Sequence, residues 1–381
     1  MSCLLKRLAR VAVLLSAMLT LTFVPAHASN SAESGAAERH LLYVVAPGIR
    51  DYLEFGGAGI LVFDMDHEHA FLKRIETPAS RKAKPENIKG VCAHAATNRL
   101  YFSTHTTLYC LDLKTEKVLW EKPLPGGCDR MSLTPDGKLL YVPSFEGPHW
   151  HVVDSASGEI ISKIEPKSGA HNTIVGLSGT RAYLAGLKSP VLTVVDVKTQ
   201  KVSSGIGPFS AAVRPFTVNA AETLCFVNVN DLLGFEVGDL KTGKKLYRVE
   251  VEGFKKGPVK RHGCPSHGIG LTPDEKEVWV CDAANSHLHI FDASHSPPKQ
   301  VASIKLREQP GWVTFSLDGR YAYPSTGEVV DTKTKKIIAA LKDEKGREVH
   351  SEKMVEIVFK DGVPVRAGDQ FGLGRAGAFR D

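Results

Sequence analysis

The chain has 381 residues and a formal net charge of +6. Its hydrophobic residues, 43% of the total, recur in short runs, and no segment has the pattern of a long amphipathic helix, which favours an all-β fold. Three of the cations lie in the first 28 residues, which carry no acid, so the chain after residue 28 has a charge of +3. A balance that mild argues against a dedicated nucleic-acid-binding protein.

Residues 1–28 have the organisation of a cleavable secretory signal. Lys6, Arg7 and Arg10 precede an apolar segment from Val11 to Val24, and the small-residue pattern Ala26-His27-Ala28 follows it. This apolar segment is short for a membrane span, so we favour cleavage over an anchor and expect no membrane span after signal removal. The chain is then expected to be periplasmic or secreted, with residues 29–38 as a flexible N-terminal segment.

An apolar run that ends in an aspartate recurs seven times along the chain. The successive spacings are 48, 42, 42, 43, 53 and 39 residues, and a short polar turn follows each aspartate. A repeat of about 40 to 50 residues built from short strands is typical of a β-propeller blade. The seven residues are Asp64, Asp112, Asp154, Asp196, Asp239, Asp292 and Asp331.

The third repeat shows the order of strands within one blade. Met131–Leu133 alternates apolar with small residues, and Thr134-Pro135-Asp136-Gly137-Lys138 then supplies a hairpin turn. Leu139–Val142, Trp150–Val153 and Ile160–Ile164 follow as the next three strands. The pattern therefore predicts four antiparallel strands per blade.

The two ends of the repeat region complement each other. The first repeat begins at Leu41–Val45 without a first strand before it, and Met354–Phe359 has the pattern of the missing strand. Pairing these segments would join edges that otherwise invite aggregation. We predict a single seven-bladed β-propeller over residues 39–367, closed by a C-terminal strand that joins the N-terminal blade, with residues 368–381 as a flexible tail.

Three segments resemble degenerate copies of the repeat of the YVTN-repeat propeller family: Tyr141-Val142-Pro143-Ser144, Phe226-Val227-Asn228 and Trp279-Val280-Cys281-Asp282. The resemblance covers nearly the whole mature chain. It implies a seven-bladed β-propeller, similar in fold to the heavy chain of quinoprotein amine dehydrogenases, and a secreted or periplasmic location. It implies little about activity, because one propeller fold hosts many unrelated functions.

Six cysteines follow the signal segment, an even number that permits disulfides in an oxidising compartment. The blade register places Cys264 just before a first strand and Cys281 at the end of the adjacent second strand. We therefore predict a disulfide bond between these two residues, and we interpret Cys225 as a small buried residue.

Candidate site residues converge where the innermost strands begin. That strand starts at one face of the ring in every blade, so equivalent positions in successive repeats meet at the mouth of the central channel. Asp129, His171, Arg214 and His267 occupy such positions. Histidines, cations and a carboxylate that converge in a concave place indicate a polar-ligand site. Further residues expected at this mouth are Arg50, Tyr52, Arg130, Glu146, His149, Asn172, His262, Trp312, Glu352 and Lys353.

Two classes of function fit this site. The first is a propeller that binds a small polar or anionic ligand, such as an acidic oligosaccharide, or a partner protein. A related version is a non-catalytic propeller subunit of a periplasmic dehydrogenase, which the resemblance to amine dehydrogenase heavy chains allows.

The second class is a polysaccharide lyase acting on a uronate-containing sugar. Eliminative cleavage beside a carboxylate needs a cation that neutralises the acid, a base for the adjacent proton and an acid at the leaving oxygen. Arg214 and Lys353 could serve the first need. His267 or His171 could be the base, and Tyr52 or another histidine the acid.

A divalent metal ion would fit either class of function. We expect its ligands among His171, His267 and a carboxylate such as Asp129, although the spacing of these residues forms no recognisable metal motif.

Overall fold

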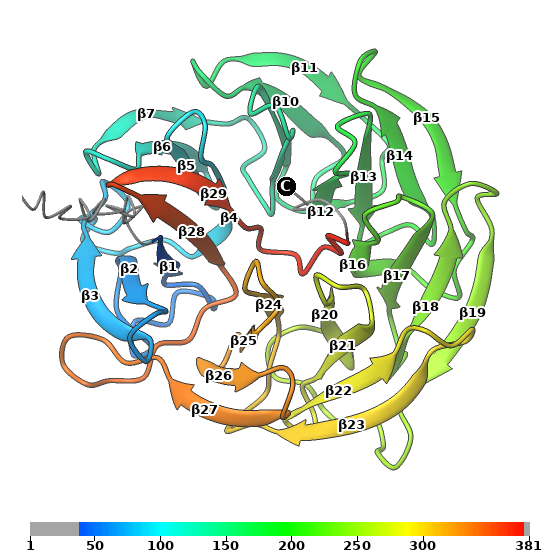
Figure 1. The fold of residues 1–381 in the computed structure, drawn as a ribbon. Coiled ribbons are helices and arrows are strands. Elements are labelled where there is room, and N and C mark those ends of the chain that lie inside the picture. The colour runs from blue at the N-terminus through cyan, green and yellow to red at the C-terminus, as the bar shows by residue number, and fades with distance from the viewer. Residues whose placement is uncertain (1–37, 377–381) are drawn as a thin grey trace, which may run out of the picture. The chain divides into compact units, whose positions relative to one another are not determined.

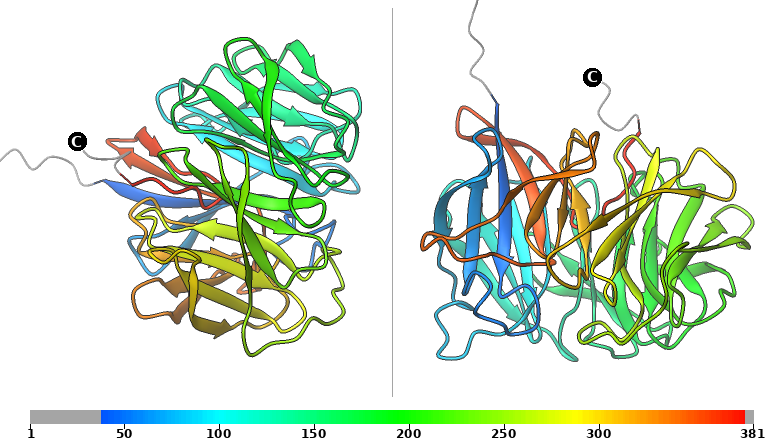
Figure 2. Two further views of the ribbon diagram at one scale, coloured as in Figure 1. Left: turned by 90° about the vertical axis from the view of Figure 1, so that its right-hand side faces the viewer. Right: turned by 90° about the horizontal axis from the view of Figure 1, so that it is seen from below.

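The computed structural model describes residues 38–376, so the predicted signal at residues 1–28 lies outside the described residues, as does most of the predicted N-terminal segment. Residues 38–376 form 29 β-strands. Over this range no helix is long and apolar enough to cross a membrane. The strands form seven antiparallel sheets that stand side by side around a ring (Figures 1 and 2). This arrangement confirms the predicted seven-bladed β-propeller.

Blade 1 joins strands from the two ends of the described chain. It contains β1 (Arg39–Ala46), β2 (Gly59–Asp64), β3 (Ala70–Ile75), β28 (Met354–Lys360) and β29 (Val363–Ala367) in the order β29-β28-β1-β2-β3. Strand β1 pairs with β28 in antiparallel register, with Val44 opposite Met354. The predicted closure by a C-terminal strand is therefore confirmed, and β29 is a fifth strand that the sequence pattern did not predict.

The other six blades follow in chain order and have four strands each. Blade 2 contains β4 (Ile88–His94), β5 (Arg99–Thr104), β6 (Thr107–Asp112) and β7 (Val118–Pro123). Blade 3 contains β8 (Ser132–Leu133), β9 (Leu139–Pro143), β10 (Trp150–Asp154) and β11 (Ile160–Ile164). Blade 4 contains β12 (Ala170–Val175), β13 (Arg181–Gly186), β14 (Leu192–Asp196) and β15 (Lys201–Ile206).

The remaining blades repeat this plan. Blade 5 contains β16 (Val213–Val218), β17 (Leu224–Val229), β18 (Gly234–Asp239) and β19 (Lys245–Glu250). Blade 6 contains β20 (Ser266–Leu271), β21 (Glu277–Asp282), β22 (His287–Asp292) and β23 (Lys299–Lys305). Blade 7 contains β24 (Val313–Phe315), β25 (Tyr321–Pro324), β26 (Glu328–Asp331) and β27 (Lys336–Ala340).

The seven recurring aspartates end the third strand of each blade and organise the turn to the fourth. In blade 2, Asp112 Oδ1 accepts hydrogen bonds from the backbone N–H groups of Lys114 and Thr115, at 3.0 and 2.7 Å. Each of the other six aspartates also accepts at least one backbone N–H from the turn that follows it. The aspartate recurs because the backbone N–H groups of each turn have no strand partner, and its side chain accepts hydrogen bonds from them.

The hydrophobic core lies between neighbouring blades. Strands β5 and β6 are buried along almost their whole length, whereas the outer strand β7 alternates between half-buried and exposed residues. One core cluster joins Val45 and Val62 of blade 1 to Val91 and Phe102 of blade 2. Because each blade buries its middle strands against its neighbours, the ring depends on closure at blade 1.

Residues 368–376 do not behave as the predicted flexible tail. Figure 1 shows this segment crossing the middle of the ring. Gln370, Phe371 and Leu373 are buried, and the latter two pack in the core cluster of blades 4 and 5. The backbone N–H of Leu271, at the end of β20, donates to the carbonyl of Gly372 at 2.7 Å. The segment therefore lies across the channel where the innermost strands end, opposite the predicted mouth.

The predicted disulfide bond is wrong. The six cysteines of the described residues are all buried free thiols. Cys264 has Arg214 and Asp231 of blade 5 as its charged neighbours, whereas Cys281 packs in the core between blades 6 and 7. Cys264 thus lies beside blade 5 and Cys281 beside blade 7, so proximity along the rim does not bring the sulfur atoms together.

We expect that a chain ending at Val349 will be insoluble, because it loses β28 and exposes unpaired edges. A chain ending at Ala367 keeps the closing strand and loses only the segment that crosses the channel. It should remain soluble and unfold at a lower temperature, because Phe371 and Leu373 no longer bury apolar surface. Solubility and thermal unfolding by circular dichroism compare the two chains. A soluble, cooperatively unfolding chain that ends at Val349 would contradict the role of closure.

Candidate functional site

Four blades present a cation or an imidazole at the second position of their innermost strand. These residues are Lys89 in β4, His171 in β12, Arg214 in β16 and His267 in β20. In each case the pairing register with the next strand shifts at this residue. A β-bulge re-aims the side chain of the residue that it leaves unpaired. One recurring irregularity therefore directs four side chains towards the channel mouth.

These side chains line a cavity of about 110 Å³ at the channel mouth. We call it the mouth cavity. Its lining includes ten of the residues that the sequence analysis placed there: Arg50, Asp129, Arg130, Glu146, His171, Arg214, His262, His267, Glu352 and Lys353.

Four expected residues do not line the mouth cavity. Tyr52 lies beyond its rim, where the guanidinium carbon of Arg261 is 5.4 Å from the ring centroid. His149 faces His151, with their Nε2 atoms 3.0 Å apart. Asn172 and Trp312 are buried behind the lining residues.

Asp129 and His171 form a buried pair on one side of the cavity. His171 Nδ1 lies 2.7 Å from Asp129 Oδ2, and Lys89 Nζ lies 3.6 Å from Asp129 Oδ1. Burial raises the pKa of the Asp129 carboxyl, but Lys89, His171 and Arg130 outweigh burial and lower the pKa to about 2. The Asp129 carboxylate accepts the Nδ1 proton of His171, and the second ring nitrogen, Nε2, has no hydrogen-bond partner in the described structure.

Glu352 is the centre of a second buried cluster. Its Oε2 atom accepts from Arg130 at 2.9 Å and from Lys353 Nζ at 2.8 Å. Lys353 Nζ also donates to the carbonyl of Gly48 at 2.9 Å. Burial raises the pKa of Glu352, but Lys353, His262 and Arg130 outweigh it and hold the pKa well below its usual range. Glu352 is therefore a carboxylate.

Burial lowers the pKa of Lys353 to about 7, although the Glu352 carboxylate opposes this change. The positive charges of Arg130 and Lys89 act in the same direction as burial.

His262 and His267 stack beside Glu352, with ring centroids 4.6 Å apart. His267 Nδ1 lies 2.8 Å from the carbonyl oxygen of Gly311, which can only accept a hydrogen bond. Burial lowers the pKa of His262 to about 4 and the pKa of His267 well below its usual value. Both rings are therefore neutral imidazoles near pH 7.

Trp312 supports the mouth cavity from below. The guanidinium carbon of Arg130 lies 3.3 Å from the centroid of its ring, and its Nε1 donates to the carbonyl of Gln370 in the segment that crosses the channel. The cation–π contact and the hydrogen bond fix Arg130 above the segment. Trp312 thus connects the mouth cavity to the segment that crosses the other end of the channel.

Lys89, Arg261 and Asn87 also line the cavity and were not predicted from the sequence. Lys89 has the same place in its strand as His171, so extending the repeat alignment to blade 2 would have found it. Arg261 and Asn87 lie in loops, and no repeat position marks them.

The mouth cavity has an excess of positive charge. Six Lys or Arg residues line it against three carboxylates. Arg50 and Arg214 form no ion pair with any described residue, whereas Arg261 is paired with Glu308 at 2.7 Å. Because the unpaired guanidinium groups share one concavity, the site favours an anion.

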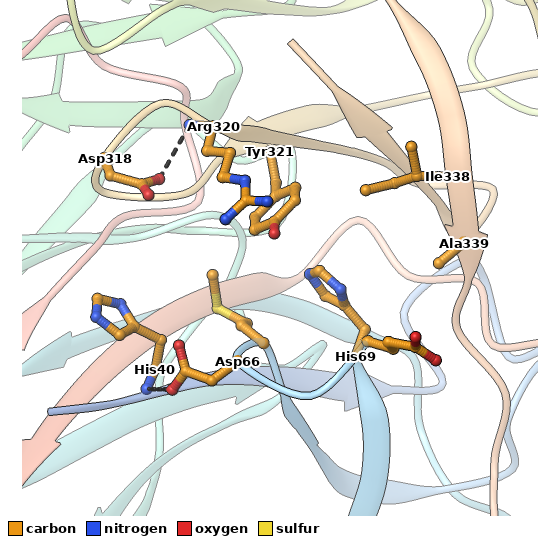
Figure 3. Close-up of a pocket in the computed structure, with 10 residues that line it drawn as sticks. His40, Asp66, His69, Asp318, Arg320, Tyr321, Ile338 and Ala339 are labelled. Carbon is orange, nitrogen blue, oxygen red and sulfur yellow. Dashed lines mark hydrogen bonds between the residues drawn. The ribbon is translucent and has the colours of Figure 1, made fainter. Parts of the chain in front are cut away.

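A larger cavity, of about 600 Å³, lies between blades 1 and 7 (Figure 3). Its polar groups are engaged locally. Asp66 accepts the backbone N–H of His40 at 2.8 Å, and Asp318 accepts that of Arg320 at 2.9 Å. Such turn contacts need no ligand, whereas the smaller mouth cavity has buried polar atoms without partners. We therefore place the candidate site at the channel mouth.

No protein-family model matches the sequence, so the YVTN-repeat resemblance stays a prediction. The chain is 25% identical over 223 residues to a 6-phosphogluconolactonase of Erwinia tasmaniensis. That alignment spans 52% of this chain and 63% of the relative, less than two thirds of its length. A solved structure, the hydrazine synthase of Kuenenia stuttgartiensis, matches with a TM-score of 0.45 and 13% identity, over 65% of this chain and 94% of that chain.

We expect the substitution Glu352→Gln to destabilise the fold by about 3–5 kcal/mol, because it leaves Arg130 and Lys353 buried without a carboxylate. The matched control is Glu146→Gln, which changes a lining carboxylate that forms no ion pair in the described structure and should shift stability by less than about 0.5 kcal/mol. Urea denaturation measures both free energies of unfolding. Equal effects of the two substitutions would contradict the central position of Glu352.

Proposed function

We propose that the protein binds a small anionic sugar derivative in the mouth cavity. The observation that carries this proposal is the pair of guanidinium groups, Arg50 and Arg214, that face the cavity without a carboxylate partner among the described residues. A phosphate or carboxylate would satisfy either group with charge-assisted hydrogen bonds.

The sugar part of the proposal has two supports. The partial sequence similarity is to a protein named for a phosphorylated sugar lactone. Phe145, which is 39% exposed, lines the cavity and offers an apolar face to a sugar ring. A ligand with both a sugar ring and an anionic group would use both kinds of contact.

A periplasmic or secreted location is part of the same proposal. It rests on the predicted signal segment, which precedes the described residues. The binding of a partner protein and the role of a dehydrogenase subunit remain alternatives, and no feature of the mouth cavity favours them over a small anion.

We expect 6-phosphogluconate to bind and glucose, its neutral counterpart, to bind at least about tenfold more weakly. Arg214→Gln should weaken 6-phosphogluconate binding by about 10- to 100-fold, because it removes a charge-assisted hydrogen bond. The matched control is Arg320→Gln, at the cavity between blades 1 and 7. Isothermal titration calorimetry at two salt concentrations measures the affinities. Equal affinities of the wild type and the Arg214 variant would contradict the proposed site.

One observation favours a lyase as a second candidate function. His171 Nε2 has no hydrogen-bond partner among the described residues, while Asp129 holds Nδ1 at 2.7 Å and so orients the ring. This is the arrangement of a general base. Arg214 lines the same cavity and could neutralise the carboxylate of a uronate beside the proton that is removed.

The lyase candidate predicts that polygalacturonate or alginate will give an unsaturated-uronate product with its characteristic ultraviolet absorbance. His171→Gln should lower kcat by about 100-fold or more and leave substrate affinity nearly unchanged, because the base acts only in the chemical step. Absence of the product with both polymers, or full turnover by the His171 variant, would rule out this mechanism.

A further inference from the structure

Three potential metal ligands meet at one wall of the mouth cavity. His262 comes from the loop before β20, His267 from β20 itself, and Glu352 from the segment that leads into β28. One ligand atom from each residue lies within 4.8 Å of the other two. His262 and His267 belong to blade 6, whereas Glu352 immediately precedes the closing strand of blade 1, so the tertiary structure brings the three residues together.

Hydrogen bonding leaves the appropriate atoms of these residues free. The Gly311 carbonyl accepts the Nδ1 proton of His267 at 2.8 Å, so the lone pair of His267 is on Nε2. Metal-bound histidines in proteins commonly donate their other N–H to a carbonyl or carboxylate in this way. His262 Nε2 and Glu352 Oε1 are buried and have no hydrogen-bond partner in the described structure.

Buried polar atoms without partners cost free energy, and most such atoms in native proteins are satisfied. His262 Nδ1 lies 3.4 Å from Glu352 Oε1, but no hydrogen bond satisfies Glu352 Oε1 or His262 Nε2 in the described structure. Glu352 Oε2 is already occupied by Arg130 and Lys353, so Oε1 is the atom that remains available. A bound cation would satisfy both orphaned atoms at once.

We propose that His262, His267 and Glu352 bind a divalent transition-metal ion. Two imidazoles and one carboxylate suit zinc and similar metals, whereas magnesium and calcium prefer oxygen ligands. The three protein ligands leave a coordination position that faces the cavity. There an anionic ligand could bind, a part of the inference that rests on the proposed function.

This ligand set differs from the one expected from the sequence. His267 is shared, but Glu352 and His262 replace Asp129 and His171. Asp129 and His171 are directed at each other, and Lys89 also contacts Asp129. The repeat register correctly placed each of these residues at the mouth, but which of them pair depends on the direction of their side chains.

The neighbouring cations set a condition on metal binding. Arg130 and Lys353 lie against Glu352, and their charges disfavour a further cation. An anionic ligand offsets that repulsion. The metal and the anion should therefore each increase the affinity of the other by the same factor.

The first experiment measures metal binding without any sugar ligand. Protein is dialysed against EDTA, desalted and titrated with zinc chloride by calorimetry, and the bound zinc is counted after a second desalting. The wild type should retain one equivalent. His262→Gln and His267→Gln should each weaken binding on the order of 100-fold or more. Retention of one tight equivalent by both variants would overturn the proposal.

The matched control is His149→Ala. His149 and His151 are another close histidine pair on the same side of the ring, with their Nε2 atoms 3.0 Å apart. The control should keep the zinc equivalent, and loss of zinc there would assign the metal to the wrong pair and overturn the proposal.

A second measurement uses the wild type alone, in case the variants fold poorly. Zinc should raise the thermal unfolding temperature of the wild type, because only the folded protein brings the three ligands together. An unchanged unfolding temperature at saturating zinc would overturn the proposal.

Failure of the metal site and failure of the proposed function give different results. Zinc binding without 6-phosphogluconate binding supports the metal site and removes the proposed ligand. Binding of 6-phosphogluconate that is equal in EDTA and in zinc, with no zinc retained, removes the metal site and leaves the proposed function standing.

Discussion

The antiparallel pairing of β1 with β28 is the interaction on which the rest of the structure depends. It joins residues that are more than 300 positions apart, such as Val44 and Met354. The chain is also held just before this pairing begins, because Ser351 Oγ donates to the Val45 carbonyl at 2.7 Å. Gly48 allows this approach, since a Cβ atom there would lie 1.8 Å from Ser351 Oγ. Closure thus completes the ring and fixes Glu352 and Lys353 at the channel mouth.

Burying the charged groups of Glu352 and Lys353 costs free energy that a purely structural ring would not need to spend. A buried ion cluster seldom stabilises a fold more than well-packed apolar residues would, because each charge loses its hydration. The cluster around Glu352 also leaves buried polar atoms without partners. A propeller needs only small or apolar side chains to fill its channel, so the fold alone does not account for this arrangement, which supports the proposed ligand site.

The two ends of the channel have different chemistry because the innermost strands have two different ends. At their starts, bulges turn Lys89, His171, Arg214 and His267 towards the channel. At their ends, regular backbone groups such as the N–H of Leu271 pair with the segment of residues 368–376. Trp312 connects that segment to the mouth, because it contacts both Gln370 and Arg130. The result is a cavity that opens at one end of the ring and has a packed base.

The architecture of this protein could be predicted from the amino-acid pattern, because the residues that form one blade are close together in the chain. Each aspartate marks one turn, each hairpin signal one strand pair, and the strand missing at the beginning is present at the end. The pattern also placed most cavity residues at the mouth, since the start of an innermost strand is a repeat position.

Which of these residues meet is a property of the tertiary structure. Asp129 contacts His171, and Glu352 contacts Arg130, Lys353 and His262. The tertiary structure also kept Cys264 and Cys281 apart and ordered residues 368–376. Those outcomes depend on side-chain directions set by bulges and on backbone hydrogen bonds between distant blades, neither of which leaves a periodic pattern in the sequence.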